Sequence, residues 1–318
     1  MGNSKGLIIL PRLQVSHANA ISGPLSWGFP APSAFTGFVH ALERQRPESY
    51  SGLKFEGVGI VCHGFDPQVS QPAGKRSQVF HLTRNPLGKD GKPGAIVEEG
   101  RVHLEVTLVI GLAGYIEEQK GQQLANWAMQ QARRMRIAGG SLLPARNGRR
   151  FEAGYYPLSG DPDARRKELR QFMRRLLPGF ILCHRPEILQ QHLQYLQLQS
   201  PESTRLDALL DLTRLNIDPV VADSDKPDDV TWHARISPAW LVPLPIGYGA
   251  ISALYPPGEV GNCRDSATPF RFVESLYSLG EWCSPHRLES LAEWLWYHQA
   301  EPENGLYICN HRKATNAI

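Results

Sequence analysis

The sequence lacks any apolar run of the roughly 18 residues that a membrane-spanning helix requires. Its longest apolar runs, such as Leu7–Leu10 and Leu108–Ile110, have the length of strands. The five cysteines are widely spread, form no C-x-x-C pair and follow no secretory leader. We therefore expect a soluble protein of the reducing cytoplasm, with no membrane partner.

Motifs of catalysis and of cofactor binding are also missing. The chain has neither a P-loop nor a G-x-G-x-x-G pattern, and no Ser-His-Asp, H-E-x-x-H or paired-carboxylate motif stands out. A cysteine lies beside or close to a histidine at three places: Cys62-His63, Cys183-His184 and Cys309-x-His311. Neighbouring strand residues point to opposite faces and seldom share one ion, and these spacings are not typical of zinc. We expect no metal centre and no cofactor.

Net charge is small as well, at +3 with histidine neutral, and does not identify a nucleic-acid partner by itself. The charges are unevenly distributed, however. Arg133 to Arg175 carries twelve Arg or Lys and four acids, whereas Glu187 to Val230 carries nine acids and three cations. The first region suits phosphate and the second does not.

Hydrophobic patterns in residues 1–150 predict alternating strands and helices. In order, they are a strand at Leu7–Val15, a helix capped by Ser33, strands at Phe55–His63 and 104–110, a helix over about 124–136, and a strand at Ser141–Leu143. Such an order is the ferredoxin-like pattern that RNA-recognition modules share. Arg12 and Gln14 alternate with apolar residues, so one sheet face is expected to be polar. The predicted fold class is α+β with a ferredoxin-like core.

The second half of the chain, residues 151–318, is predicted to be helical, loop-rich and rich in proline. Helices are expected at 165–176, 187–199 and 203–215, strands near 239–248, and a final aromatic helix at about 286–299. We expect this part to complete the fold and to make partner contacts.

Residues Pro67 to Lys89 contain no acid and combine cations with aromatic and amide side chains. The side chains of interest are Lys75, Arg76, Arg84, Phe80, His81 and Asn85. Cations of this kind bind backbone phosphates, aromatic or imidazole rings stack on splayed bases, and an Asn reads or positions a base. A solvated basic loop has the same composition, and both interpretations stay open.

Other candidates for RNA contact come from position and chemistry. Arg136 and Ser141 flank Gly139-Gly140, where backbone amides can approach a phosphate, although a helix C-cap and turn explains the glycines equally. Asn19 and Trp27 lie in or beside a Gly/Pro-rich loop, where an exposed aromatic ring stacks on a base and a buried one serves the core. Arg12 belongs to the polar face of the first strand.

An alternative interpretation is a metal-independent ribonuclease. His17, His63 or His81 would act with Lys75 as acid and base, because a histidine near neutral pKa can move the 2′-OH proton. The chain has 11 histidines, so candidates are plentiful, and nothing in the sequence fixes a catalytic pair.

Long strings of the sequence resemble those of one known family. They include Leu10-Pro11-Arg12-Leu13, Asn19-Ala20-Ile21-Ser22, Trp27-Gly28-Phe29-Pro30, Gly57-Val58-Gly59-Ile60-Val61-Cys62-His63, Ser70-Gln71-Pro72-Ala73-Gly74-Lys75-Arg76, Leu82-Thr83-Arg84-Asn85-Pro86-Leu87, Ala138-Gly139-Gly140-Ser141, Pro257-Gly258-Glu259-Val260 and Leu279-Gly280-Glu281-Trp282. The chain thus resembles the Csy-two family, the fifth-Cas-type subunit of type I-F CRISPR surveillance complexes and a member of the RAMP superfamily. It departs from the family mainly at 116–123, 147–163, 218–231 and the final tail.

This resemblance implies a fold, a function and partners. The fold would be a ferredoxin-like core at residues 1–150 with a thumb-like insertion at about 66–98, followed by the C-terminal part. The function would be non-catalytic: to bind and cap the 5′ handle of the guide RNA (crRNA) in antiviral defence. The partners would be the large subunit and an adjacent backbone RAMP subunit of the same ribonucleoprotein. Whether target DNA also contacts the chain is left open.

Overall fold

The predicted elements of the first half are present in the computed structural model, which describes residues 4–75, 77–81, 86–94, 99–144, 151–221, 230–235, 237 and 239–311. Their bounds are β1 Gly6–Asn19, β2 Ile21–Gly23, β3 Ser26–Trp27, α1 Pro32–Arg44, β4 Lys54–Pro67, β5 Val69–Ser70, β6 Val79–Phe80, β7 Arg101–Ala113, α2 Glu118–Ala132, β8 Arg136–Ile137 and β9 Gly140–Leu143. The order strand, helix, strand, strand, helix, strand is confirmed by β1, α1, β4, β7, α2 and β9.

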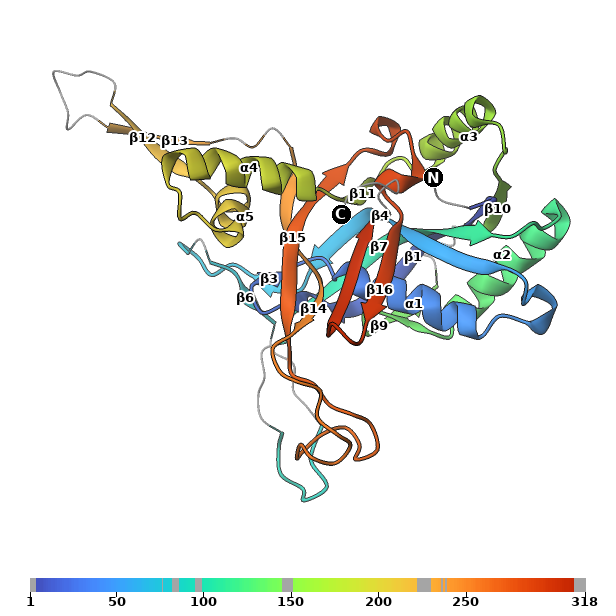
Figure 1. Ribbon diagram of the computed structural model, residues 1–318, viewed down its shortest axis with the longest axis horizontal. Coiled ribbons are helices and arrows are strands. Elements are labelled where there is room, and N and C mark those ends of the chain that lie inside the picture. Colours follow the sequence, from blue (N-terminus) through green and yellow to red (C-terminus); the bar gives the residue numbers. More distant parts are fainter. Residues whose placement is uncertain are drawn as a thin grey trace.

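These four strands lie in one large antiparallel sheet in the order β4, β7, β1, β9 (Figure 1). The strand β7 is central and pairs with β1 along most of its length, from Gly6↔Leu112 to Asn19↔Arg101. On its other side it pairs with β4, for example Ile60↔Leu108. The protein is therefore of mixed α and β class, with strands distant in sequence lying side by side.

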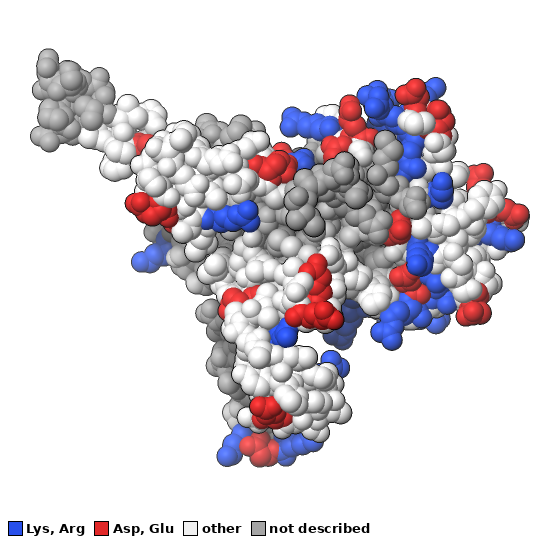
Figure 2. Space-filling view, in the orientation of Figure 1, with Lys and Arg blue, Asp and Glu red and all other residues white. Residues whose placement is uncertain are grey.

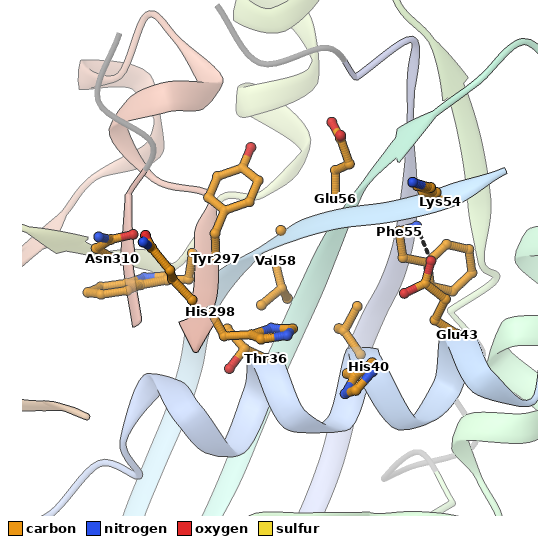
Figure 3. Close-up of a pocket in the computed structure, with 14 residues that line it drawn as sticks. Thr36, His40, Glu43, Lys54, Phe55, Glu56, Val58, Tyr297, His298 and Asn310 are labelled. Carbon is orange, nitrogen blue, oxygen red and sulfur yellow. Dashed lines mark hydrogen bonds between the residues drawn. The ribbon is translucent and has the colours of Figure 1, made fainter. Parts of the chain in front are cut away.

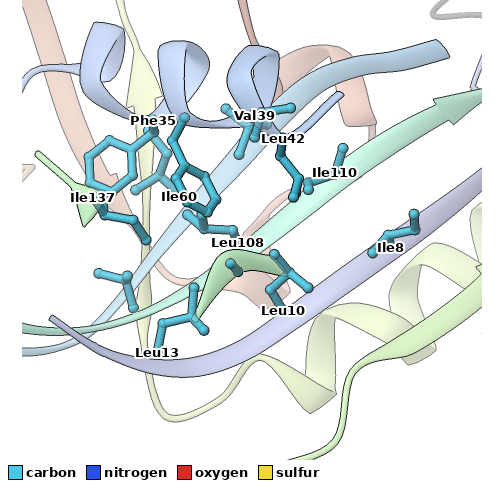
Figure 4. Close-up of a cluster of buried hydrophobic side chains, with 14 of the residues drawn as sticks. Ile8, Leu10, Leu13, Phe35, Val39, Leu42, Ile60, Leu108, Ile110 and Ile137 are labelled. Atoms are coloured by element: carbon cyan, nitrogen blue, oxygen red, sulfur yellow. The ribbon is translucent and has the colours of Figure 1, made fainter. Parts of the chain in front are cut away.

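Both α1 and α2 cover the same face of this sheet. The side chains Phe35, Phe38, Val39 and Leu42 of α1 recur at helical spacing and are buried against Ile60, Leu108 and Ile110 (Figure 4). From α2, Leu124, Ala125, Ala128 and Met129 join the same cluster. On the opposite face a second cluster around Leu7, Ile9 and Val109 is covered by α3. Helices α1 and α2 therefore cover one face of the sheet, whereas α3 covers only part of the other face.

Two helix ends differ from the sequence-based expectation. The helix α1 begins at Pro32 after an Ala31 N-cap without a side-chain hydrogen bond, so Ser33 lies inside the first turn. Proline suits the first helical position because its φ is preset and it needs no N–H partner. The helix α2 ends at Ala132, and Arg136 belongs to β8 because it pairs with Ser141 across the turn at Gly139.

The second half contains the three expected helices but is not mainly helical. Its elements are β10 Gly154–Pro157, α3 Pro162–Arg175, β11 Phe180–His184, α4 Pro186–Gln199, α5 Arg205–Thr213, β12 Ile217–Val221, β13 Val230–Ala234, β14 Leu241–Ala250, β15 Val273–Cys283, β16 Trp296–Glu301 and β17 Leu306–His311. The main sheet runs on through β11, β15, β14, β17 and β16 to β4. Both halves therefore share one sheet, while the division near residue 150 stays a prediction.

The expected final helix at 286–299 is wrong. Two single 3-10 turns, Pro285–Arg287 and Leu291–Glu293, precede the strand β16. All of Trp294, Leu295, Trp296 and Tyr297 are buried, and such a continuous buried run suits a central strand rather than a one-sided helix. The indole Nε1 of Trp296 donates to the carbonyl of Leu182 in β11, 2.9 Å away.

Three segments project from this body (Figure 1). The first is the β5–β6 hairpin within the predicted thumb, followed by the described residues 86–94. The second is the arm, which we define as the described residues 186–221 and 230–235 and which contains α4, α5 and the paired strands β12 and β13. The third is the long loop 251–272 between β14 and β15. Among the described residues no helix is long and apolar enough to cross a membrane.

Close packing of β4 against Trp294 predicts a sensitive glycine. A Cβ added to Gly59 would lie 2.1 Å from Cζ3 of the fully buried Trp294, so Gly59→Ala is expected to destabilise the fold by about 1–3 kcal/mol. The matched variant is Gly37→Ala in α1, where an added Cβ meets nothing within 4 Å. It should be neutral or stabilise by up to about 1 kcal/mol. Urea unfolding of both variants measures this, and equal effects would contradict the packing.

Candidate nucleic-acid interface

The part of the sheet that α3 leaves uncovered is polar. On β1 the side chains of Arg12, Gln14 and Ser16 alternate with the buried Leu13 and Val15, and they are half-buried. Opposite them on β7 are His103, Glu105 and Thr107, with Gln14 paired to Glu105. We name the half-buried residues Arg12, Gln14, Ser16, His103 and Glu105 the open face, and Thr107 is buried beside them. Sheet surfaces with polar and ring-bearing side chains are a common platform for single-stranded RNA.

Arg12 is held at the margin of the open face by several contacts. Its guanidinium forms an ion pair with Glu105 at 3.1 Å and donates to the carbonyl of Pro178 at 3.4 Å. The same guanidinium lies 5.8 Å from the ring centroid of Phe151. At φ 51° its backbone is in the left-handed region, which non-glycine residues rarely adopt. Arg12 therefore joins the turn after α3 to the sheet, and its predicted RNA contact stays a prediction.

The imidazole of His63 has defined hydrogen-bond roles. Nδ1 lies 2.6 Å from the Pro178 carbonyl, which can only accept, so Nδ1 carries the proton. Nε2 then accepts from the hydroxyl of Thr107, 2.7 Å away, and that hydroxyl accepts from the Arg12 amide at 3.0 Å. Burial lowers the pKa of His63, which keeps the ring neutral. Both ring nitrogens of His63 are therefore engaged in holding the structure.

Beside the open face is a hollow of about 290 Å³ that the ends of β1, β4, β7 and β9 line. The rings of His17 and His103 meet edge to face with centroids 4.5 Å apart, and the His17 amide donates to Nδ1 of His103 at 3.1 Å. The Ser16 hydroxyl lies 2.8 Å from Nδ1 of His17. Phe65 and Asp66 complete the walls. Rings, a hydroxyl and a carboxylate are groups that stack on and hydrogen-bond to an unstacked base.

Five of the predicted contact residues gather at one end of the sheet: Asn19, Trp27, Phe80, Arg136 and Ser141. We name this set the end cluster. The rings of Trp27 and Phe80 meet edge to face with centroids 5.3 Å apart, and Trp27 is 47% exposed. A half-exposed aromatic pair of this kind can stack on a base.

Backbone contacts hold the end cluster together. The side chain of Asn19 bonds both backbone groups of Ile21, with Nδ2 donating to the carbonyl at 2.8 Å and Oδ1 accepting from the amide at 3.1 Å. Its own amide donates to the carbonyl of Ala138, in the turn between Arg136 and Ser141. Ile21 in turn pairs with Trp27. The predicted Gly-Gly turn and the predicted loop therefore meet, although they are far apart in sequence.

The remaining predicted residues belong to the excursion after β4. Lys75 is exposed in the turn between β5 and β6, and His81 follows β6 with Nε2 2.8 Å from the hydroxyl of Ser70. Arg76, Arg84 and Asn85 lie outside the described residues. Among the described residues of the predicted thumb, Phe80 belongs to the end cluster through its ring contact with Trp27.

A larger hollow of about 460 Å³ lies between α1, β4 and β16 (Figure 3). Its walls include His40 and His298, whose ring centroids are 5.3 Å apart. Glu43 points to β4, where its carboxylate accepts from the Phe55 amide at 2.9 Å. No group of three or more metal-ligating side chains occurs anywhere in the described parts of the chain. None of the predicted contact residues that the structure describes lines this hollow.

Comparison with known proteins identifies the family of this chain. Residues 8–309 match the family described as "CRISPR-associated protein (Cas_Csy2)". The chain is also 54% identical over 310 residues to "CRISPR-associated protein Csy2" of Pseudomonas aeruginosa (strain UCBPP-PA14), covering 95% of this chain and 94% of that relative. The chain belongs to the Csy2 family. The resemblance to the type I-F family found in the sequence is thereby confirmed.

In this Csy2-family chain, sequence reasoning missed the hollow at His17 and His103. Period-two alternation did place Arg12 and Gln14 on a polar strand face. What was missing is the register that makes Gln14 and Glu105 neighbours. The left-handed backbone of His17, at φ 57°, leaves no signal in the sequence.

The hydroxyl of Thr107 connects the open face of this Csy2-family chain to its neighbours, which predicts a costly substitution. Thr107→Val keeps the shape but leaves the Arg12 amide and His63 Nε2 without their partner, and Thr107 is only 2% exposed. A loss of about 1–3 kcal/mol in unfolding free energy is expected. The control Thr231→Val, exposed on β13, should stay within about 0.5 kcal/mol. A neutral Thr107→Val in urea unfolding would refute the network.

Proposed function

We propose that this chain is a non-catalytic subunit of a type I-F CRISPR surveillance complex that binds and caps the 5′ handle of the guide RNA. Membership of the Csy2 family supports the complex. The observation that carries the RNA contact is the end cluster beside the open face, with the half-exposed Trp27 against Phe80. Single-stranded RNA is bound by such combinations of aromatic, amide and cationic groups.

The proposed core is ferredoxin-like, as in the RAMP superfamily. Its support is the sheet order β4, β7, β1, β9, all antiparallel, with α1 and α2 on the same face. In this arrangement the other face is left for a ligand, and here that is the open face. RNA-recognition modules use the corresponding sheet surface for RNA.

The handle would contact the end cluster and the excursion after β4. In this proposal Trp27, Phe80 or His81 stacks on bases, Asn19 or Asn85 positions a base, and Lys75 with Arg76, Arg84 and Arg136 binds phosphates. Ser141 lies beside Arg136 in the β8–β9 hairpin and would add a hydroxyl. Thus the proposed thumb is the segment of about 66–98, which would close over the handle.

The large subunit and an adjacent backbone RAMP subunit are the proposed protein partners, and the arm is the proposed contact. Apolar side chains are exposed there: Leu198 by 86%, Leu215 by 72% and Trp232 by 67%. Exposed aromatic and large apolar side chains are common at protein interfaces. The five cysteines form no disulfide, which suits a complex that works in the cytoplasm.

Loss of the stacking ring tests the RNA contact. The chain is co-expressed with its large subunit, and affinity for a labelled 5′-handle RNA is measured per assembled pair. Trp27→Ala should weaken binding by roughly 1–3 kcal/mol, the usual worth of one stacked base. Tyr115→Ala, which removes an 88% exposed ring at the opposite end of β7, is the control and should bind like the parent.

The charge variant Lys75→Glu/Arg76→Glu tests the thumb in the same assay. Because cations there would neutralise RNA phosphates, it should bind the handle more weakly and with a smaller salt dependence. Unchanged handle affinity in both Trp27→Ala and the charge variant would exclude the proposed site.

The histidine pair in the hollow beside the open face favours a test of the ribonuclease alternative. His17 and His103 are in ring contact where RNA would lie, and acid–base cleavage needs two such groups close together. Repeat RNA incubated with the purified chain in EDTA should remain intact under our proposal. Specific cleavage that His17→Ala, His103→Ala or His81→Ala abolishes would establish an enzyme instead.

A further inference from the structure

The helix α3 presents a strongly basic surface that the proposed handle site does not use. Its exposed side chains include Arg166, Lys167, Arg170, Arg174 and Arg175. In Figure 2, Lys and Arg gather over α3 with a few acids among them. The apolar side of the helix, with Leu169, Phe172 and Met173, is buried on the sheet. The cations therefore form the outer side of a helix that is fixed in place.

Three of these cations have no assigned role in the fold. Arg170 pairs with Glu289 at 3.3 Å, and Arg175 donates to the hydroxyl of Tyr156 at 3.0 Å. For Arg166, Lys167 and Arg174, none of the ion pairs or hydrogen bonds within the described residues includes the side chain. The helix dipole favours cations at Arg174 in the last turn, but it does not account for Arg166 or Lys167 nearer the start.

The acids near α3 are mostly engaged with the backbone. Asp161 caps the helix by accepting from the Ala164 amide at 2.8 Å. Glu168 accepts from the Ser159 amide, also at 2.8 Å. Asp163 is exposed in the first turn, close to the N-terminal end of the helix. Neutralisation of the outer cations by these carboxylates is therefore limited, and a ligand on this surface would be an anion.

The kind of anion follows from what the outer surface of α3 lacks. No large apolar side chain within α3 is exposed, whereas the core of a protein interface usually contains some. The arm, with Leu198 and Trp232 exposed, shows the contrasting surface of this same chain. Exposed aromatic rings, on which single-stranded nucleic acid stacks, are absent from α3 as well. A cationic helix surface that exposes no large apolar or aromatic side chain of its own suits the phosphate backbone of a duplex.

We propose that the outer surface of α3 binds the phosphate backbone of duplex DNA, without regard to its sequence. Arg166, Arg170 and Arg174 recur every four residues and so line one side of the helix, about 6 Å apart along its axis. Guanidinium groups bind phosphate oxygens in a bidentate manner. An α-helix about 10–12 Å wide fits beside the wide groove of B-form DNA, whereas the major groove of an RNA duplex is narrow and inaccessible.

This surface is distinct from the handle site but borders it. The turn that follows α3 is joined to the open face, because the Pro178 carbonyl accepts from both Arg12 and His63. A duplex on α3 would therefore run past the edge of the sheet that is proposed to hold the guide RNA. The inference goes beyond the proposed function and does not depend on it.

The test measures binding of a short labelled DNA duplex, unrelated to the guide, to the full chain by fluorescence anisotropy from about 50 to about 200 mM salt. Arg166→Glu/Arg174→Glu should weaken binding on the order of tenfold or more. The slope of log affinity against log salt should fall by about 2. The matched control is Arg44→Glu/Arg264→Glu, with the same change in net charge at two exposed positions outside α3. Its affinity should stay within a few-fold of the parent.

Handle-RNA affinity of the same preparations separates the two proposals. The affinity for handle RNA should be unchanged in Arg166→Glu/Arg174→Glu, and this result also shows that the variant is folded. If the parent protein does not bind the handle RNA, only the proposed function is refuted. Equal weakening by both charge variants, or none by either, would overturn the α3 site. Tighter binding of an RNA duplex than of DNA would overturn the B-form assignment. Loss of a protein partner by the α3 variant, with duplex binding intact, would make α3 a protein-contact surface.

Discussion

The antiparallel pairing of β1 with β7 is the constraint on which the rest of the structure depends. Its register shifts twice, between Leu10 and Leu13 and between Val15 and Ala18. Arg12 and His17, both with left-handed backbones, lie within these two irregularities. Bulges re-aim side chains while the strand continues. One strand can therefore pack on two helices and also present the polar groups of the open face.

The sequence predicted the elements of the core well because their hydrophobic periods are regular. The stripe from Phe35 to Leu42 and the alternation around Leu108 leave little doubt between helix and strand. The error at 286–299 has a physical cause: Leu291 and Leu295 have helical spacing, but Trp294, Trp296 and Tyr297 fill the remaining positions and are buried too. These side chains are buried because other parts of the chain pack on them from every side. The spacing of apolar residues in the sequence does not carry that information.

The sequence predicted which residue types belong to the candidate site, but it did not predict how they are arranged in space. Asn19, Trp27, Arg136 and Ser141 were chosen from two separate loops, and the hydrogen bond from Asn19 to Ala138 is what unites them. The second half also contributes, since the Tyr277 hydroxyl of β15 accepts from the Leu25 amide in the β2–β3 turn. Contacts between such distant positions depend on strand register. The proposed role of α3 was likewise not predictable, because it depends on which of its Arg and Lys side chains form ion pairs or hydrogen bonds within the fold.

The pairing of β16 with β4 has a consequence for how the chain folds. The two strands meet at Val58 and Trp296, and about three-quarters of the chain separates these residues. At about 5–20 residues per second, the ribosome needs on the order of tens of seconds to reach Trp296 after it has made Val58. Until then the edge of β4 at Val58 and the side of Gly59 that packs on Trp294 lack their cover, although β11 can already pair with β4 at Val61 and Cys62. The nascent first half is therefore a sheet with an open hydrophobic edge, prone to wrong pairing and suited to chaperone protection, until the last strands arrive.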